Sequence, residues 1–229
     1  MVQRAEAAAG AHAPLVAVFD LDGTITRRDT LLPYVWGFLV RYRPWRLPWL
    51  LAVLPECVRF IAGRADHGTL KSALIRATLG GAQRAQLEAW TARFVTRLLK
   101  HGVFNDALQR VAQHRADGDY LVLLSASPEL FVPQVGAALG FAQVLCTGLT
   151  WNADTLLGYL STPNRRGEEK VRCLERLRGA HPGQVFAAYG NAACDVPHLR
   201  MVERPLLVNG NAGARKLARR YGIPTATWR

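Results

Sequence analysis

Short apolar runs and helical patterns alternate along most of the chain. The apolar runs have the length of strands, and glycine or polar residues after them predict turns. Continuous apolar runs of this kind are typical of parallel strands that are buried on both faces. We expect five such strands, at Leu15 to Phe19, Tyr120 to Leu124, Gln143 to Thr147, Val185 to Tyr189 and Pro205 to Val208.

Helical periodicity separates these runs. It predicts helices at Glu129 to Leu139, Glu168 to Leu177, Ala193 to Met201 and Gly213 to Tyr221. Residues 151 to 159 have the pattern of a small hairpin, with its turn at Asn152 to Asp154. Strands that alternate with helices of about ten residues predict an α/β fold with a doubly wound, Rossmann-like parallel sheet.

One long segment interrupts the alternation. Residues 26 to 104 have helical periodicity and little strand pattern, and Gln83 to Lys100 has the pattern of an amphipathic helix. The segment is too long for a simple crossover between two strands. We therefore expect a helical cap domain at residues 26–104, inserted into a catalytic core made of residues 1–25 and 105–229.

Composition places the chain among globular proteins. It has 229 residues, of which 50% are hydrophobic and 20% charged. The four cysteines stand singly, without the C-x-x-C spacing of a metal or redox site, which favours a reducing, cytoplasmic compartment. Residues 1 to 13 lack the apolar segment of a secretory signal, so we expect a frayed tail there.

The net charge of +12 favours an anionic partner. Nucleic acid, an anionic membrane surface and a phosphorylated substrate all meet that condition. The arginines are scattered along the chain, and no zinc-finger or RNA-binding pattern is present. We therefore do not expect nucleic acid as the partner.

Two carboxylates follow the first expected strand. Asp20 and Asp22 belong to the run Phe19-Asp20-Leu21-Asp22-Gly23-Thr24, at the strand end where α/β enzymes bind their ligands. A turn after the strand would explain Asp22 and Gly23. It would not explain Asp20, whose carboxylate follows a buried strand and needs a charged partner.

Three further signals follow later strands or open a helix. Ser125 follows the second strand, Lys170 lies in the first turn of an expected helix, and Asn191 and Asp195 follow the fourth strand. Taken singly, these residues are explained as well by a helix cap, a solvated lysine and an Asx turn. In the expected sheet, however, the strand ends meet at one edge, which brings their side chains to one place.

In this order the four signals resemble the motifs of the haloacid dehalogenase superfamily, in particular its phosphatases with a helical cap inserted after the first motif. The resemblance implies that Asp20 attacks phosphorus and forms an aspartyl-phosphate. It implies that Asp22 is the general acid and then the general base. Thr24, Ser125 and Lys170 would bind the oxygens of the transferring phosphoryl group.

The same resemblance implies a magnesium ion. Its ligands would be the Asp20 carboxylate, the main-chain carbonyl of Asp22 and the residue at position 191, with Asp195 as a further ligand or as a partner of a metal-bound water. The family pattern has aspartate where this chain has Asn191. An amide oxygen can bind the metal but brings no negative charge, so we expect weaker magnesium binding without loss of activity.

The expected cap begins with two apolar runs, Leu31 to Val40 and Leu47 to Leu54, which the basic, tryptophan-containing run Arg41 to Arg46 separates. Neither apolar run reaches the roughly 20 residues that span a bilayer. Their composition predicts peripheral contact with a membrane. Ordinary packing inside the cap is the alternative.

The substrate expectation rests on a finer resemblance. The early apolar insertion, D-L-D-G-T and Gly167-Glu168-Glu169-Lys170-Val171 resemble the branch that contains phosphatidylglycerophosphatase C. This resemblance implies a lipid or other amphiphilic phosphomonoester at the cytoplasmic membrane face.

Two alternatives to a lipid phosphatase stay open. One is a soluble phosphatase of small metabolites such as phosphoserine, in which Asp29 stands near the place of the acidic residue that holds the substrate amine. The other is a non-catalytic protein that binds an anion or a membrane, in which Asn191 marks a decayed metal site.

Overall fold

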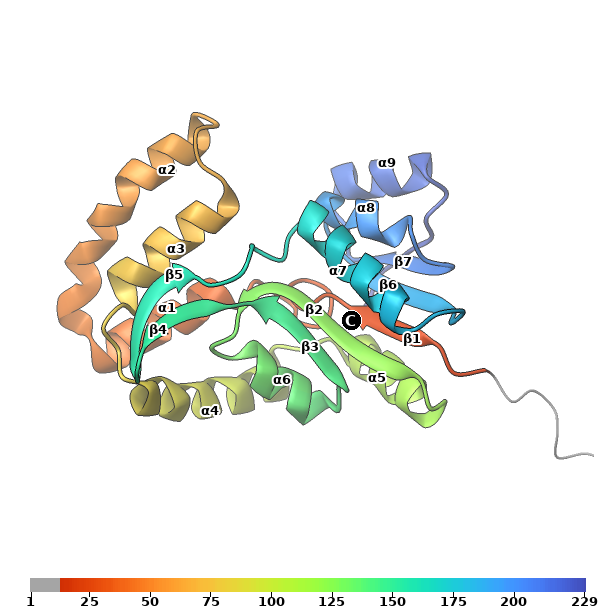
Figure 1. Ribbon diagram of the computed structural model, residues 1–229, viewed down its shortest axis with the longest axis horizontal. Helices are drawn as coiled ribbons and strands as arrows, with labels where there is room; N and C mark the ends of the chain where they lie inside the picture. Colours follow the sequence, from red (N-terminus) through yellow and green to blue (C-terminus); the bar gives the residue numbers. More distant parts are fainter. Residues whose placement is uncertain (1–12) are drawn as a thin grey trace, which may run out of the picture.

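A six-stranded parallel sheet forms the centre of the computed structural model, which describes residues 13–229 (Figure 1). The tail expected at residues 1 to 13 lies almost wholly outside the described residues. The strand order is β3-β2-β1-β6-β7-β8, and every neighbouring pair is parallel. The strands are β1 (Val16–Phe19), β2 (Tyr120–Pro128), β3 (Gln143–Thr147), β6 (Phe186–Gly190), β7 (Arg204–Val208) and β8 (Thr225–Ala226).

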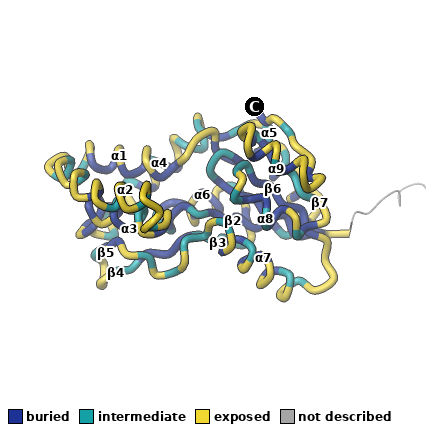
Figure 2. Tube along the Cα trace, turned by 90° about the horizontal axis from the view of Figure 1, so that it is seen from above, coloured by how far each residue is buried: buried dark blue, intermediate teal, exposed yellow. Residues whose placement is uncertain are grey.

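The apolar runs supply both faces of this sheet, because successive strand residues point to opposite sides. Phe19 belongs to one hydrophobic cluster, and its neighbour Val18 belongs to another. In the same way Leu123 and Leu124 fall into different clusters. The strands are therefore buried on both faces, as their continuous apolar pattern predicts (Figure 2).

Helices cover the two faces of the sheet (Figure 1). The first face is covered by α5 (Asn105–Ala116) and α6 (Val132–Leu139), whose buried residues join the cluster that contains Phe19. The second is covered by α7 (Glu168–Ala180), α8 (Val196–Leu199) and α9 (Ala212–Arg220), whose buried residues join the cluster of Val18. The expected α/β fold with a doubly wound parallel sheet is thus observed.

The long insertion folds into helices that extend from the carboxyl end of β1. We call them the cap helices; they are α1 (Leu31–Tyr42), the 3-10 helix η1 (Pro44–Val53), α2 (Leu54–Ile61), α3 (His67–Thr78) and α4 (Arg84–His101). The hairpin of β4 (Leu149–Asn152) and β5 (Thr155–Leu160) packs against them, since Gly81 N donates to Leu156 O at 2.7 Å. Residues distant in sequence therefore complete the cap, while its expected boundaries at residues 26 and 104 stay a prediction.

Some elements differ from the predicted ones. Strand β2 continues past Leu124 to Pro128, and the expected helix at 129–139 begins only at Val132. The helix expected at 193–201 is divided into the 3-10 turn η2 (Ala193–Asp195) and the one-turn helix α8, which has a proline at its start. Strand β8 has two residues, too few for a detectable sequence pattern.

The two apolar runs of the cap differ in how far their side chains are buried. Helix α1 buries five of the ten residues of the first run, among them Tyr34, Phe38 and Leu39 in the large core cluster, so half of this run packs internally. The second run forms most of η1 and leads into α2, and there large apolar side chains remain exposed. We call this the η1–α2 surface: Trp45, Trp49, Leu51, Leu54, Val58 and Ile61. Within residues 13–229, none of the helices has the length and apolar character needed to cross a bilayer.

Candidate active site

Four acidic or amide side chains and one lysine meet at the carboxyl end of the sheet. Asp20 and Asp22 follow β1, and Asn191 and Asp195 follow β6, which pairs with β1 in parallel. Lys170 comes from the first turn of α7. All five line one cavity of about 330 Å³, so the structure brings them together as the parallel strand ends predict.

Lys170 joins two carboxylates in a buried cluster. Its Nζ donates to Asp20 Oδ1 at 2.7 Å and to Asp195 Oδ1 at 2.8 Å. Asp195 Oδ2 also accepts the backbone N–H groups of Asn191 and Ala192, at 3.1 Å and 2.9 Å. Asp195 thus fixes both the turn after β6 and the lysine.

Burial and charge shift the pKa values of this cluster in different directions. Burial raises the pKa of Asp20 to about 7, although the Lys170 ammonium opposes the shift. For Asp195 the lysine prevails over burial and holds the pKa below its usual range. The pKa of Lys170 is raised, because the two carboxylates outweigh the effect of its burial. The lysine is therefore charged, and the charge of Asp20 depends on pH near neutrality.

Asp22 is held by a separate set of hydrogen bonds. Its Oδ1 accepts from Thr30 N at 2.8 Å and from Thr30 Oγ1 at 2.6 Å, and its Oδ2 accepts from Ser127 Oγ at 2.6 Å. Burial raises the pKa of Asp22, while the hydroxyl groups of Ser127 and Thr30 oppose this shift. A carboxyl group with a raised pKa and a fixed orientation is suited to proton transfer.

Asn191 lies against the turn that carries both aspartates. Gly23 has a φ of +77°, and a Cβ there would come within 2.0 Å of Asn191 Nδ2. Glycine is therefore required at this position for two reasons, the positive φ of the backbone and the close approach of the Asn191 amide. The contact places Asn191 next to the Asp20–Asp22 loop.

The cap helices supply the other wall of the cavity. It contains Leu31, Leu32, Leu70 and Leu74 together with His67 and Lys71. Lys71 Nζ donates to Ala126 O and, at 2.6 Å, to Asn164 Oδ1. Burial lowers the pKa of Lys71 to about 8. The wall is thus largely apolar and carries a cation close to the carboxylates.

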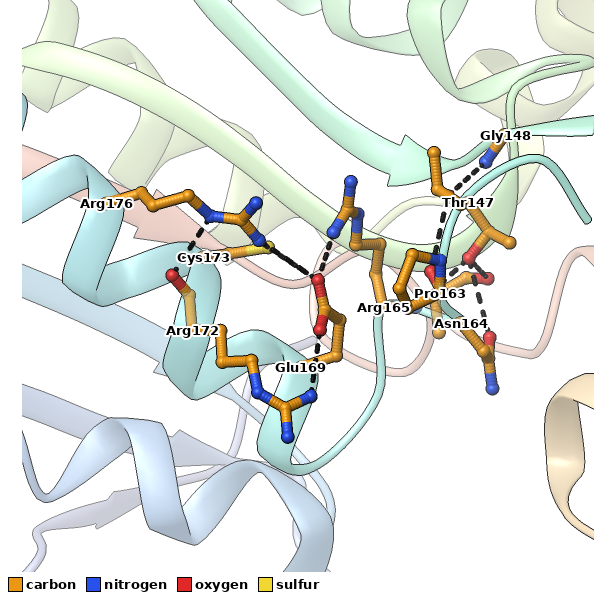
Figure 3. A network of polar contacts seen from close by, with 11 residues as sticks. Thr147, Gly148, Pro163, Asn164, Arg165, Glu169, Arg172, Cys173 and Arg176 are labelled. Atoms are coloured by element: carbon orange, nitrogen blue, oxygen red, sulfur yellow. Dashed lines mark hydrogen bonds and ion pairs between the residues drawn. The ribbon is translucent and has the colours of Figure 1, made fainter.

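A polar network beside the cavity fixes the segment that leads into α7. Thr147 Oγ1 donates to Ala126 O at 2.8 Å and contacts Asn164 (Figure 3). Glu169, the neighbour of Lys170, is paired with Arg165, Arg172 and Arg176. These contacts orient the start of α7, from which Lys170 reaches the cluster.

Two expected phosphate-binding residues lie behind the cavity wall. Thr24 is fully buried and its Oγ1 donates to Asp20 Oδ2 at 3.1 Å. Ser125 is also fully buried, and its Oγ accepts the N–H of Ser127 at 3.0 Å. Their contact with phosphate stays a prediction.

Sequence reasoning missed the residues that position Asp22 and those that the cap and the α7 linker contribute. Ser127 lies two residues after Ser125, and this position next to a motif residue is a signal that the sequence does contain. Lys71, Asn164 and Arg166 have no local pattern that marks them, since only the tertiary fold brings them to the cavity. Thr30 likewise has no local pattern, and its role is visible only from its hydrogen bonds to Asp22.

Comparison with known proteins decides the family. The family model for haloacid dehalogenase-like hydrolases matches residues 17–200, a range that contains every motif residue described above. The chain belongs to this family. The predicted family and enzyme class, a haloacid dehalogenase-like phosphatase, are confirmed at this level.

The relatives are similar over most of their length. Protein CicA of Caulobacter vibrioides is 32% identical over 202 residues, which cover 84% of this chain and 85% of the relative. A Mycobacterium tuberculosis protein named as a probable phosphatase is 26% identical over 221 residues, covering 95% of this chain and 76% of the relative.

A solved structure shows the same fold. A probable phosphoserine phosphatase from Vibrio cholerae has a TM-score of 0.70 and 14% identity, with 93% of this chain and 60% of that chain covered. This likeness confirms the predicted fold class, a Rossmann-like parallel sheet with an inserted helical cap.

Proposed function

We propose that this member of the haloacid dehalogenase-like family is a magnesium-dependent phosphomonoester hydrolase that acts through an aspartyl-phosphate intermediate on a lipid or other amphiphilic phosphate. The observation that carries the proposal is the pairing of two differently held carboxylates in one cavity. Asp20 is bound to a buried lysine, and Asp22 is bound only by neutral hydroxyl and amide donors.

The donor set suits a magnesium ion. Asp20 and Asp195 bring two carboxylates to one ammonium. When both are ionised, this group of three carries one net negative charge, to which the Asp22 carboxylate adds. The Asn191 side chain lies beside the Asp20–Asp22 loop, and no hydrogen bond of this side chain is found within residues 13–229. Asp20, the Asp22 carbonyl, Asn191 and Asp195 are oxygen donors of the kind that magnesium prefers. When bound, the ion would neutralise charge on the transferring phosphoryl group.

One nucleophile, Asp20, and one acid–base group, Asp22, then account for the two steps of the reaction. In the first step an oxygen of Asp20 attacks phosphorus, the bond to the alcohol breaks, and Asp22 gives its proton to the leaving oxygen. In the second step Asp22 takes a proton from water, whose oxygen attacks phosphorus and releases phosphate and the Asp20 carboxylate. Lys170 offsets the negative charge beside Asp20 in both steps, and we assign Thr24 and Ser125 to the support of the phosphoryl site.

The cap wall of the cavity supports an amphiphilic substrate. A volume of about 330 Å³ accommodates a phosphate and a small headgroup, and the leucines of the wall continue to Leu32, which is 61% exposed. An apolar chain could leave the cavity along this path. The η1–α2 surface supports peripheral contact with an anionic membrane, because its exposed tryptophan and aliphatic side chains belong to a strongly basic chain.

A small-metabolite phosphatase is the second candidate. Asp29 lines the cavity, where a carboxylate could bind a substrate amine. Its Oδ1 already accepts the N–H of Leu31 at 3.0 Å and caps α1, which favours the amphiphilic substrate over an amino acid.

The test is release of inorganic phosphate from a panel of phosphomonoesters, with and without magnesium. The panel contains phosphatidylglycerophosphate, a prenyl phosphate, phosphoserine and a short alkyl phosphate. We expect magnesium-dependent release that is highest for the amphiphilic members and that Asp20→Asn abolishes. The Asp154→Asn variant is the matched control, since this exposed carboxylate lies on the hairpin turn. Equal release by Asp20→Asn and the wild-type protein would contradict the assigned nucleophile.

A further inference from the structure

A second cavity lies between the start of α1 and the carboxyl-terminal half of α4. Its volume is about 700 Å³, which is within the range of small-molecule sites. It shares Asp29 with the catalytic cavity and none of the other residues that line it. We call it the α1–α4 groove.

Aromatic side chains contributed by α1 and α4 line the groove. They are Trp36, Trp90 and Phe94. Trp90 lies directly against α1, because a Cβ on Gly37 would approach its ring to 2.4 Å, and its Nε1 donates to Tyr34 O at 3.1 Å. Trp36 is 57% exposed although it is a large aromatic residue. The groove therefore offers one fixed and one accessible ring to a ligand.

Four arginines line the same groove: Arg27, Arg28, Arg93 and Arg97. Within residues 13–229 none of them forms an ion pair with a carboxylate. Arg27 is oriented by the hydrogen bond from its Nε to Val103 O at 2.9 Å, and its guanidinium stacks on Phe104. Asp29 is the single acidic residue that lines the groove, and its Oδ1 is used to cap α1.

This arrangement differs from an ordinary solvated basic surface. A solvated basic surface does not require aromatic side chains beside its arginines, and an apolar cleft does not require arginines. The groove combines both. Guanidinium groups bind phosphate, sulfate and carboxylate groups with charge-assisted hydrogen bonds, while flat rings bind apolar or aromatic bodies. We propose that the α1–α4 groove is a second binding site, for an organic anion that joins an aromatic or other apolar body to a phosphate, sulfate or carboxylate group.

The chain offers a site-specific probe. It contains six tryptophans, of which only Trp36 and Trp90 line the groove, while Trp45 and Trp49 belong to the η1–α2 surface. The full-length protein is labelled with 5-fluorotryptophan, and each fluorine resonance is assigned by a tryptophan-to-phenylalanine substitution. Naphthalene-2-sulfonate is then titrated at constant ionic strength. We expect saturable shifts of the Trp36 and Trp90 resonances.

A double variant tests the role of the cations. Arg93→Gln with Arg97→Gln removes two exposed charges of α4, and Lys216→Gln with Arg220→Gln removes two exposed charges of α9 at the same spacing. We expect the first variant to weaken binding about tenfold and the second to leave it unchanged, as for the loss of charge-assisted hydrogen bonds. The resonances without ligand report whether each variant is folded.

Three results would overturn the proposal. The Trp36 and Trp90 resonances could fail to respond to the sulfonate. They could respond equally in the Arg93 and Arg97 double variant, which would remove the arginines from the site. Inorganic sulfate at the same concentration could shift them as strongly, which would leave no role for the apolar body.

Discussion

The carboxyl end of the sheet and the outer surface of the cap differ in which side chains they bury. The sheet end buries charged groups, whereas the cap surface exposes apolar ones. At the sheet, Asp20, Asp195 and Lys170 are buried and satisfy one another, because unpaired charges there would be costly. On the cap, large apolar side chains and arginines stay exposed. The difference indicates that the polar groups at the sheet are held in fixed positions, while the side chains on the outer surface of the cap are free to contact other molecules, as the two proposals require.

Replacement of Asp22 tests whether the carboxylates at the end of the sheet carry out the chemistry. We expect Asp22→Asn to lower kcat by at least about 10²-fold, because the leaving oxygen loses its proton donor. The side chain keeps its size and can still accept from Thr30. Steady-state phosphate release measures the effect, with Asp154→Asn as the control. A kcat within a few-fold of the wild-type value would show that Asp22 is not the general acid.

Introduction of negative charges into the η1–α2 surface tests whether the exposed apolar side chains of the cap contact a membrane. We expect Val58→Glu with Ile61→Glu to reduce retention on anionic vesicles by at least about tenfold, since two apolar groups no longer enter the bilayer interface. Turnover of a water-soluble phosphomonoester should not change. Co-sedimentation at low salt measures retention.

The matched control places the same charges on the core, with Val185→Glu and Tyr221→Glu at exposed positions. Equal loss of retention in both variants would show that net charge, and not this surface, governs membrane contact. Wild-type protein that does not sediment with vesicles would reject membrane contact altogether.

Lys71 connects the two regions, since it extends from the cap into the catalytic cavity. The pKa of its ammonium is lowered to about 8 by burial, so the group is charged below that pH and neutral above it. We expect Lys71→Met to raise KM about fivefold at pH 7, the equivalent of about 1 kcal/mol of lost attraction for the phosphate.

The pH dependence gives the sign of this effect. In the wild-type protein KM should rise as the pH passes through 8, and in Lys71→Met that rise should be absent. Lys216→Met, on the exposed face of α9, is the control. A KM that rises with pH to the same degree in Lys71→Met would assign the dependence to another group.

The same division explains what the sequence could predict. The sheet and the motif residues of the core were predictable, because Asp20, Lys170 and Asp195 adjoin strongly patterned elements and stand in a recognised order. The cap was predictable only as helical. The second apolar run lies in a 3-10 helix that begins at Pro44 and contains Pro48, which its apolar pattern did not predict. No local pattern shows that residues 81 to 84 pair with a hairpin about 70 residues later.

The smallest expected effect concerns the one motif position where the chain departs from its family's pattern. Asn191→Asp adds a carboxylate beside Asp20 and Asp195, so it should lower the magnesium concentration for half-maximal activity by about threefold. Without metal the extra charge is repelled by its neighbours, so the melting temperature should fall, and added magnesium should restore it. Asn105→Asp, at the exposed start of α5, is the control for charge alone. An unchanged magnesium dependence together with a melting temperature that magnesium does not affect would mean that residue 191 is not a ligand, and the metal would then have to be held by Asp20, Asp195 and the Asp22 carbonyl.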